Sequence, residues 1–386
     1  MLKVKSKSQL KKNKNFDLDF FSTPFCFKEN KKYKIYEYPK LNKSSFWKPS
    51  NKKNKNVLVV SGPARNGNHL MLSLLDGHPD IGRHPGEDDF LRTFFSNINL
   101  NQKKTINNII KKKIEFIFRL SGQPSFKNKD KEGFNKWKEL NLLKKNNKEL
   151  DVWSGNQPEN VGHVQDFQSL IPDIDYKSFE KKLSKIKKKK IKNFFDFFYY
   201  YLNASRKLCS NFKEKKNIKF PYRVTGSGLR RELFFLLERQ KNISVICPIR
   251  KFESFYFSYA KTRHNLNKKF SQKALDDMWE HWRHKVIDYL ILKSKYPDKV
   301  AIIKYEEMVY STPSCMRKLC KFLKIKFSKK MLNPTVLDIP SLGNSSFKKS
   351  EKLRGKIYKK KSSFPKTIQL PDEYKEIMKN IDKHAL

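Results

Sequence analysis

One short segment of the chain encodes a strand, a glycine-bounded loop and a helix in direct succession. The apolar run 57–60 favours a strand, and Gly62 and Gly67 bound the loop that follows it. Apolar residues then recur at helical spacing, namely Leu70, Met71, Leu74 and Leu75. Gly77 is the expected stop signal of this helix. Backbone N–H groups and the helix dipole converge in such a loop, so the segment predicts an anion-binding cradle.

The two glycines have the spacing of a Walker A loop, but the next two residues differ from it. Asn68 and His69 stand where a nucleotide triphosphatase has a lysine and a serine or threonine. Without that lysine and the Mg²⁺-binding hydroxyl, metal-dependent triphosphate chemistry is disfavoured and no metal site is expected. Arg65 places a cation inside the loop instead. We therefore expect a phosphate-like anion bound without a metal, and an ordinary strand–helix turn is the alternative for the loop alone.

Apolar strands alternate with helices in the second half of the chain. The pattern predicts strands at 223–225, 243–248 and 300–305. It predicts helices at 233–237, from 252 onward, at 275–292 and after an N-cap at Thr312 followed by Pro313. Trp279 and Trp282 lie on the apolar face of one helix and are interpreted as core residues. The expected fold class is α/β, with a parallel central sheet flanked by helices.

A second candidate site follows the predicted strand 243–248. Arg250 comes at the end of this strand, and Ser258 follows eight residues later on the next helix. Ligands gather at the carboxyl ends of parallel strands, so Arg250 should face the same crevice as the glycine loop. Arginine suits an anion site because its planar guanidinium makes paired, charge-assisted bonds to phosphate oxygens. An exposed arginine and an unrelated helix serine are the alternative interpretation of this weak pattern.

These two segments resemble the nucleotide-binding motifs of the sulfotransferases that use 3′-phosphoadenosine-5′-phosphosulfate (PAPS). The family's 5′-phosphosulfate loop is roughly P-[KR]-S-G-T-[TN]-[WL], and Arg65 and Gly67 match it. The strand-end arginine and the serine resemble the family's 3′-phosphate site, although Lys251-Phe252 replaces the common Asp-Pro. The resemblance implies a P-loop-like sulfotransferase fold with a helical insertion. It also implies a set of PAPS-binding residues, namely Arg65, Asn66, Gly67, Asn68, His69, Arg250 and Ser258.

The resemblance continues towards the end of the chain. The segment 305–309 resembles the family's Tyr-Glu-Asp-Leu segment, and 319–323 resembles the helix after it. The pair 334–335 and the segment 343–347 match the closing loop of many bacterial members. These segments are expected to be mainly structural, and their order and separation across about 57–350 favour the family.

Glu87 and Asp88 are the candidate general bases. The segment 86–89 is similar to a Gly-Glu-acid segment that carries the catalytic glutamate of tyrosylprotein sulfotransferases. The resemblance implies that Glu87, or else Asp88, accepts the proton of the acceptor group. His84 and His78 are rivals, although His78 precedes a proline and is interpreted as a turn residue. An acidic helix cap is the alternative for the whole segment. Arg65 is the expected catalytic cation, which stabilises charge on the leaving group.

The chain is strongly basic, with 85 Lys and Arg against 38 Asp and Glu and a net charge of +47. Such a charge suggests a nucleic-acid or anionic-surface partner. The lysines are spread through every segment, however, and most aromatic residues are phenylalanines inside apolar runs. We interpret the charge as the result of biased base composition and expect no specific nucleic-acid partner. A basic RNA- or surface-binding protein with an inactive loop stays as an alternative, as does a small-molecule kinase.

The five cysteines have no close pairing, which indicates buried thiols in a reducing compartment. No apolar run reaches membrane-spanning length, and the first residues lack a secretory pattern. A cytoplasmic location is expected, and peripheral membrane contact stays open.

The chain is expected to form one sulfotransferase domain with extensions at both ends. We expect a basic N-terminal extension at 1–55, the domain at 56–350 and a basic C-terminal tail at 351–386. Residues 100–220 are expected to form a variable, mostly helical insertion. The predicted reaction moves a sulfuryl group from PAPS to a hydroxyl or amine, on a carbohydrate or small metabolite.

Overall fold

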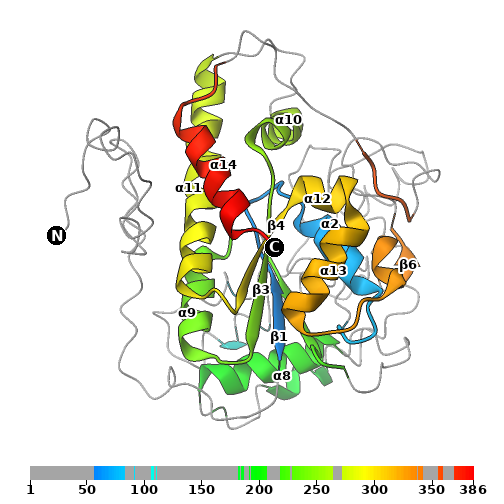
Figure 1. Ribbon diagram of the computed structural model, residues 1–386. Helices are drawn as coiled ribbons and strands as arrows, with labels where there is room; N and C mark the ends of the chain where they lie inside the picture. The colour runs from blue at the N-terminus through cyan, green and yellow to red at the C-terminus, as the bar shows by residue number, and fades with distance from the viewer. Residues whose placement is uncertain are drawn as a thin grey trace, which may run out of the picture.

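The computed structural model of the protein is built around one parallel sheet (Figure 1). It describes residues 56–82, 193–206, 218–226, 228–263, 272–336, 338–341, 355–359 and 369–386, together with a few positions between 91 and 191. Within these residues the sheet has four strands, in the order β2-β1-β3-β4. They are β1 (Val57–Val60), β2 (Tyr222–Thr225), β3 (Ile243–Ile249) and β4 (Val300–Lys304). The predicted α/β class and parallel sheet are confirmed.

Both faces of the sheet are buried, which explains why the central strand β1 is apolar throughout. Val57 and Val59 of β1 belong to the core on one face, whereas Leu58 and Val60 belong to the core on the other. This alternation follows from the two-residue repeat of a strand. β1 and most of β3 and β4 carry apolar runs because helices cover both sides of a parallel sheet.

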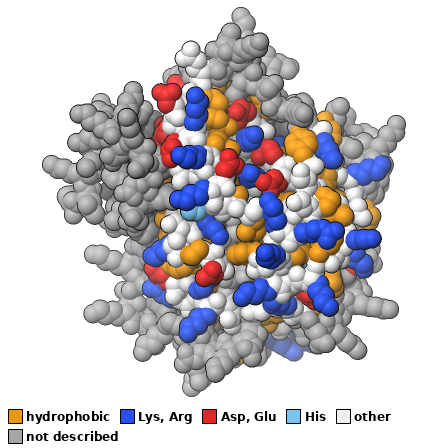
Figure 2. Space-filling model, in the orientation of Figure 1, with side chains coloured by type: hydrophobic (Ala, Val, Ile, Leu, Met, Phe, Trp, Pro, Cys, Tyr) orange, Lys and Arg blue, Asp and Glu red, His pale blue; other side chains and the backbone are white. Residues whose placement is uncertain are grey.

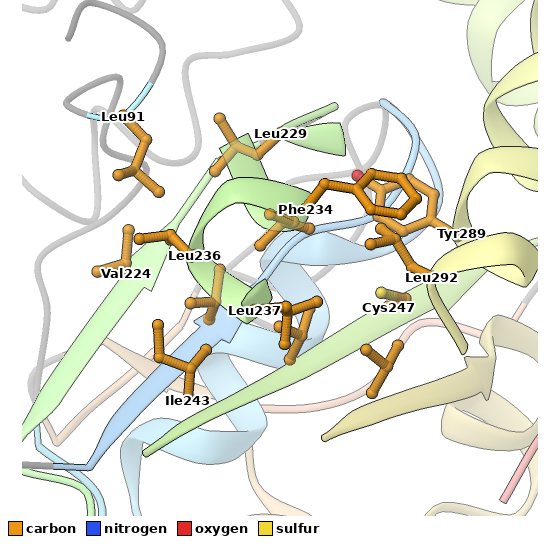
Figure 3. Packing of buried hydrophobic residues seen from close by; sticks show 14 of the residues in the cluster. Leu91, Val224, Leu229, Phe234, Leu236, Leu237, Ile243, Cys247, Tyr289 and Leu292 are labelled. Carbon is orange, nitrogen blue, oxygen red and sulfur yellow. The ribbon is translucent and has the colours of Figure 1, made fainter. Parts of the chain in front are cut away.

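The larger core lies on the face that carries the longest of the described helices, α11 (Gln272–Lys295). It takes residues from α8 (Phe194–Arg206), α9 (Arg230–Arg239), α10 (Phe252–Arg263), α11 and α14 (Glu373–His384). Figure 3 shows Leu236 and Leu237 of α9 lying against Val224 and Ile243 of the sheet. Trp279 and Trp282 of α11 are buried in this core, so their predicted packing role is confirmed.

The opposite face is covered by α2 (Asn68–Asp76), α12 (Tyr305–Tyr310), α13 (Thr312–Leu323) and the 3-10 helix η6 (Lys329–Leu332). The hairpin of β5 (Thr335–Val336) and β6 (Ile339–Pro340) packs against α2. A buried ion pair ties this layer to the sheet, since Arg223 Nη2 lies 3.3 Å from Asp76 Oδ1. The second oxygen of Asp76 accepts hydrogen bonds from Thr335 Oγ1 and from the Asp338 N–H. The carboxylate at the end of α2 therefore joins three elements.

Two local predictions from the sequence are wrong by one residue. Tyr305 was expected to end a strand but begins α12, because the pairing of β4 with β3 stops at Lys304. Thr312 was expected to cap α13 but is its first helical residue, and Ser311 is the N-cap. The Thr312 hydroxyl donates a hydrogen bond to the Met308 carbonyl of α12 at 2.6 Å, and no side chain caps the N-terminus of α13.

The C-terminal residues pack onto the sheet domain. Ile377 and Ile381 of α14 are buried in the larger core. The Leu386 N–H donates to the Ile302 carbonyl at 3.1 Å, at the outer edge of β4. We therefore propose that the domain extends past 350 and includes 369–386, within the range expected to be a tail. The expected extension 1–55 lies outside the described residues, as does most of the insertion 100–220 apart from α8.

Two further findings concern thiols and membranes. Cys247, Cys315 and Cys320 are buried free thiols, and the other two cysteines lie outside the described residues. Among the helices that the structure describes, none combines the length and the apolar character needed to cross a membrane.

Candidate functional site

The glycine loop leaves the carboxyl end of β1 and is packed too tightly for side chains at either glycine. A Cβ on Gly62 would lie 2.3 Å from the Pro248 carbonyl oxygen, which belongs to β3. A Cβ on Gly67 would lie 2.4 Å from Tyr305 Cδ2, and Gly67 also has φ +97°. Both glycines are therefore required by close approach, and the second also by its backbone conformation.

Helix α2 begins directly after this loop and ends as predicted near Gly77. Gly67 is its N-cap and no side chain caps it, so its first-turn N–H groups point back towards the loop. Arg65 sits at the tip of the loop with φ 65°, a conformation that few residues other than glycine adopt. A cation, a helix N-terminus and a tight backbone turn thus lie together at one end of the sheet.

Two asparagine side chains stabilise the shape of the loop from within. The Asn66 side chain donates to the Ala64 carbonyl at 3.0 Å and accepts the Arg250 N–H at 2.6 Å. Asn68 donates to the Gly62 carbonyl at 3.2 Å. Both residues were predicted to bind the nucleotide. In the structure, both amides hold the loop closed, and Asn66 attaches it to Arg250, the residue after β3.

Arg250 follows β3 directly and lies against the glycine loop, as the expectation of a shared crevice requires. Its Nη1 is 3.4 Å from the Arg65 carbonyl oxygen, and its own carbonyl accepts the Trp282 indole N–H at 2.9 Å. Within the described part of the chain, Arg250 Nε is buried without a hydrogen-bond partner. A buried guanidinium nitrogen without a partner is costly, and an anionic ligand would satisfy it.

Tyr305 and Glu306, at the start of α12, complete this side of the site. The Arg250 guanidinium carbon lies 3.9 Å from the centroid of the Tyr305 ring. Glu306 Oε1 accepts the Lys251 N–H at 3.2 Å. Burial raises the pKa of Glu306, and the nearby Arg250 charge opposes that shift. The sequence pattern marked this segment as structural, and its contact with Arg250 was not foreseen.

The end of β2 forms the other flank of the loop. The Gly228 N–H donates to the Gly62 carbonyl at 3.0 Å, and the Leu229 N–H donates to Ser61 Oγ at 3.3 Å. Ser61 Oγ is in turn 2.9 Å from Tyr289 Oη on α11. The contact between the backbones of Gly228 and Gly62 continues the pairing of β2 with β1 beyond the last strand residue. The loop is thus braced by both neighbouring strands.

Arg230 and Asp288 form an ion pair on this flank, and sequence reasoning did not single out either residue. Arg230 begins α9, and its Nη1 pairs with Asp288 Oδ2 on α11. The Asp288 side chain is 6% exposed, and burial raises its pKa to about 6 although Arg230 opposes the shift. No local motif marks such a pair, because its members are distant in sequence and meet only in the folded chain.

The remaining predicted site residues are placed as follows. Ser258 is half-buried on α10, and His69 is half-buried in the first turn of α2. His78 is a buried turn residue, as expected, and its Nδ1 accepts the Asp80 N–H at 3.0 Å. The candidate bases Glu87 and Asp88 lie outside the described residues, as does His84.

The surface charge shows no concentration on the face drawn in Figure 2. Lys and Arg side chains are spread across that face among acidic and hydrophobic ones. Over the residues that the structure describes, no group of three or more His, Cys, Asp or Glu side chains could hold a metal ion. Two arginines, backbone amides and a helix N-terminus lie together here, and groups of these kinds can bind an anion.

Comparison with known proteins identifies the family of this chain. A family model described as "Sulfotransferase domain" matches residues 58–376. The sulfotransferase domain from the Synechococcus PCC 7002 olefin synthase is similar in structure, with TM-score 0.42, 14% identity, and coverage of 87% of this chain and 97% of that chain. The sulfotransferase domain from the curacin biosynthetic pathway has TM-score 0.37, 14% identity, and coverage of 85% and 98%. Comparison with curated proteins found no match.

Proposed function

We propose a reaction for this chain from the family to which it belongs. The chain is a member of the sulfotransferase family, because the family's domain model matches residues 58–376. The reaction is transfer of a sulfuryl group from PAPS to a hydroxyl or amine acceptor. A carbohydrate or small metabolite is the proposed acceptor. The donor is a substrate with anionic groups at both its 5′ and 3′ positions, so it needs two separate anion sites.

The contact between the glycine loop and Arg250 is the observation that carries this proposal. The loop leaves β1 and Arg250 leaves β3, and the Asn66 side chain joins them through a 2.6 Å hydrogen bond. The residues fit the donor, since the loop excludes side chains at Gly62 and Gly67 and the buried Arg250 Nε has no protein partner among the described residues. We assign the loop to the 5′-phosphosulfate and Arg250, with Ser258, to the 3′-phosphate.

The chain's own residues then have separate tasks in the transfer. Arg65 and the backbone amides of the loop would stabilise the negative charge that builds on the leaving phosphate. Glu87, or its neighbour Asp88, would accept the proton of the acceptor group. Asn66, Gly67, Asn68 and His69 would hold the 5′ end of the donor. Positioning of donor and acceptor in line supplies a further share of the rate.

A titration of adenosine 3′,5′-bisphosphate, the product side of the donor, tests the proposal without knowledge of the acceptor. Calorimetry should detect binding that does not depend on Mg²⁺ and is tighter than the binding of ATP. Arg250→Ala should weaken bisphosphate binding by about 1.5–3 kcal/mol, the scale of one hydrogen bond to a charged group. Adenosine 5′-phosphosulfate lacks the 3′-phosphate, so its affinity should change little. Equal weakening of both ligands would remove Arg250 from the 3′ site.

The proposed cellular location and partners follow from the same proposal. We place the reaction in the cytoplasm, since the buried free thiols Cys247, Cys315 and Cys320 suit a reducing compartment. The partner is the acceptor substrate, and we propose no specific nucleic-acid partner. Peripheral contact with an anionic membrane is compatible with the high lysine content and is not needed for the chemistry.

A further inference from the structure

Tyr374, in the first turn of α14, contacts two helices that are distant from it in sequence. Its hydroxyl donates a hydrogen bond to Glu253 Oε2 of α10 at 2.6 Å. Its ring centroid lies 5.9 Å from that of Trp279 and 6.1 Å from that of Trp282, both on α11. Helix α14 lies along α11 near the end of the chain (Figure 1). One side chain of this C-terminal helix therefore joins α10 to α11.

The first turn of α14 is held in this place by charge, apolar packing and the hydrogen bond. Glu373 Oε2 lies 2.6 Å from Arg283 Nε on α11, and the Arg283 side chain is 10% exposed. Ile377, one turn further along α14, is buried in the larger core. Burial and the hydrogen bond to Glu253 raise the pKa of the Tyr374 hydroxyl, so it stays protonated and serves as the donor.

The residues that Tyr374 contacts also adjoin Arg250. Trp282 Nε1 donates to the Arg250 carbonyl at 2.9 Å. Glu253 lies in the first turn of α10, which begins two residues after Arg250. The ring of Tyr374 therefore packs on the side chain that holds the Arg250 backbone, and its hydroxyl holds the helix that follows Arg250.

The position of the Arg250 side chain depends on the backbone that carries it. Among the described residues, its Nη1 makes one long hydrogen bond, 3.4 Å, to the Arg65 carbonyl, and its Nε is buried without a partner. Its ring contact with Tyr305 imposes weaker directional restraints than a short hydrogen bond would. Its own N–H donates to the Asn66 side chain at 2.6 Å, so a shift of this backbone would change the spacing between Arg250 and the glycine loop.

We propose that Tyr374 is a positioning residue for Arg250, so that the C-terminal helix contributes to the affinity of the 3′ anion site. The inference rests on the proposed function, in which Arg250 binds the 3′-phosphate of the donor. It goes beyond that function because donor binding then depends on a helix outside the two anion-binding segments. The effect should be largest for the 3′ end of the donor, since the ring and the hydroxyl of Tyr374 both lead to residues beside Arg250.

Tyr374→Phe tests the inference, because it removes the hydroxyl and keeps the ring. The wild type and the variant are titrated with adenosine 3′,5′-bisphosphate and with adenosine 5′-phosphosulfate, which lacks the 3′-phosphate. Bisphosphate affinity should fall about fivefold, the order of the net contribution of one hydrogen bond, and 5′-phosphosulfate affinity should stay within about twofold. Ile381→Val is the matched control, since it removes a buried methyl group two turns further along α14. It should lower the Tm and leave both affinities unchanged.

A double-mutant cycle traces the effect to Glu253 and Arg250. Glu253→Ala should reproduce the loss, whereas Glu253→Gln should retain most of the affinity ratio, because its amide oxygen can still accept the hydrogen bond. Tyr374→Phe combined with Glu253→Ala should lose no more than either single variant. In an Arg250→Ala background, Tyr374→Phe should change bisphosphate affinity by less than about twofold.

Two results would overturn the inference alone. One is an affinity ratio in Tyr374→Phe equal to that of the wild type. The other is an equal loss for both ligands, which is the result of a purely structural role. Failure of the wild type to bind the bisphosphate would instead overturn the proposed function, and this inference with it. That failure is distinguishable because it is seen before any mutation is made.

Discussion

At the scale of single residues, Arg65 combines an unfavourable backbone conformation with the only side-chain cation of the segment 61–67. Its φ of 65° costs on the order of 1 kcal/mol or more for a residue other than glycine, so a small flexible residue would suit the turn better. A long cationic side chain at this strained position is explained if its charge has a function. The proposed use is stabilisation of the leaving phosphate.

Arg65→Ala should therefore lower kcat by about 10²–10³, the range for loss of one preorganised donor to a developing charge. Arg65→Gly is the matched control, because glycine adopts the observed φ without strain and still lacks the charge. Both variants should lose activity to a similar extent and keep a Tm near that of the wild type. Steady-state kinetics and thermal unfolding check this, and wild-type turnover in either variant would contradict the assignment.

Glu87 belongs to the same scale, as the proposed proton acceptor. Glu87→Gln keeps the size of the side chain but cannot take up a proton, so turnover should fall while bisphosphate affinity stays within a few-fold. Asp88→Asn and His84→Ala are the matched variants. Activity lost only in one of those two would move the base to that neighbour. Full activity in all three would leave the segment as an acidic helix cap.

At the scale of elements, helix α11 braces three parts of the site. Trp282 donates to the Arg250 carbonyl, Asp288 pairs with Arg230, and Tyr289 lies 2.9 Å from Ser61 Oγ. These residues lie within two turns of one helix, so α11 connects the ends of β1 and β3 with the start of α9. The burial of Tyr289 raises the pKa of its hydroxyl, which keeps it neutral near Ser61.

The Asp288–Arg230 pair should make stability depend on pH in a defined window. Burial raises the pKa of Asp288 from 3.8 to about 6, so the folded state binds its proton more readily than the unfolded state does. The contribution of Asp288 is therefore fully present below about pH 4 and is lost as the pH rises through about 6. Two pKa units correspond to about 3 kcal/mol, which is an upper limit for the change.

Urea unfolding of the wild type and of Asp288→Asn between pH 4 and pH 7 measures this contribution. The stability of the wild type relative to the variant should decrease across that window and then become constant. Other titrating groups are common to both proteins and cancel in the difference. Parallel pH profiles for the two proteins would show that Asp288 keeps an ordinary pKa in the folded chain.

At the scale of the whole molecule, the parallel sheet places charge from distant segments at one edge. Asn66 and Arg250 are separated by 184 positions in sequence and are joined by one hydrogen bond. The loop has Asn68 and His69 where a Walker loop would hold a lysine and a Mg²⁺ ligand. In the proposed function, arginines, backbone amides and the α2 N-terminus would therefore meet the negative charge of the donor.

Chelation by EDTA should accordingly leave turnover unchanged, and added Mg²⁺ should not raise it. An assay with purified protein, PAPS and a panel of hydroxyl and amine acceptors would measure both effects. A parallel assay of a Mg²⁺-dependent kinase under the same conditions confirms that the chelator is effective. Loss of transfer in EDTA would count against the proposal and favour the kinase-like alternative.

Much of the fold could be predicted because its signals are local. Four apolar residues before Gly62 indicate β1, and the helical spacing after Gly67 indicates α2, since burial on both sheet faces requires such patterns. The proximity of Arg250 to the loop was also predictable, because parallel strands of one sheet end at the same edge. The family membership follows from the same motifs and is confirmed by the family match.

The amino-acid sequence by itself therefore determined β1, α2 and the parallel arrangement of the central sheet, and it marked the two segments that we propose as anion sites. Only the tertiary structure decided what surrounds them. β4 ends one residue earlier than its apolar run suggested, so Tyr305 is the first residue of α12, and its ring lies against Arg250. Arg230 meets Asp288 because α9 and α11 pack on the same face of the sheet. Such contacts depend on how helices from distant segments pack together, and no local pattern of residues predicts that packing.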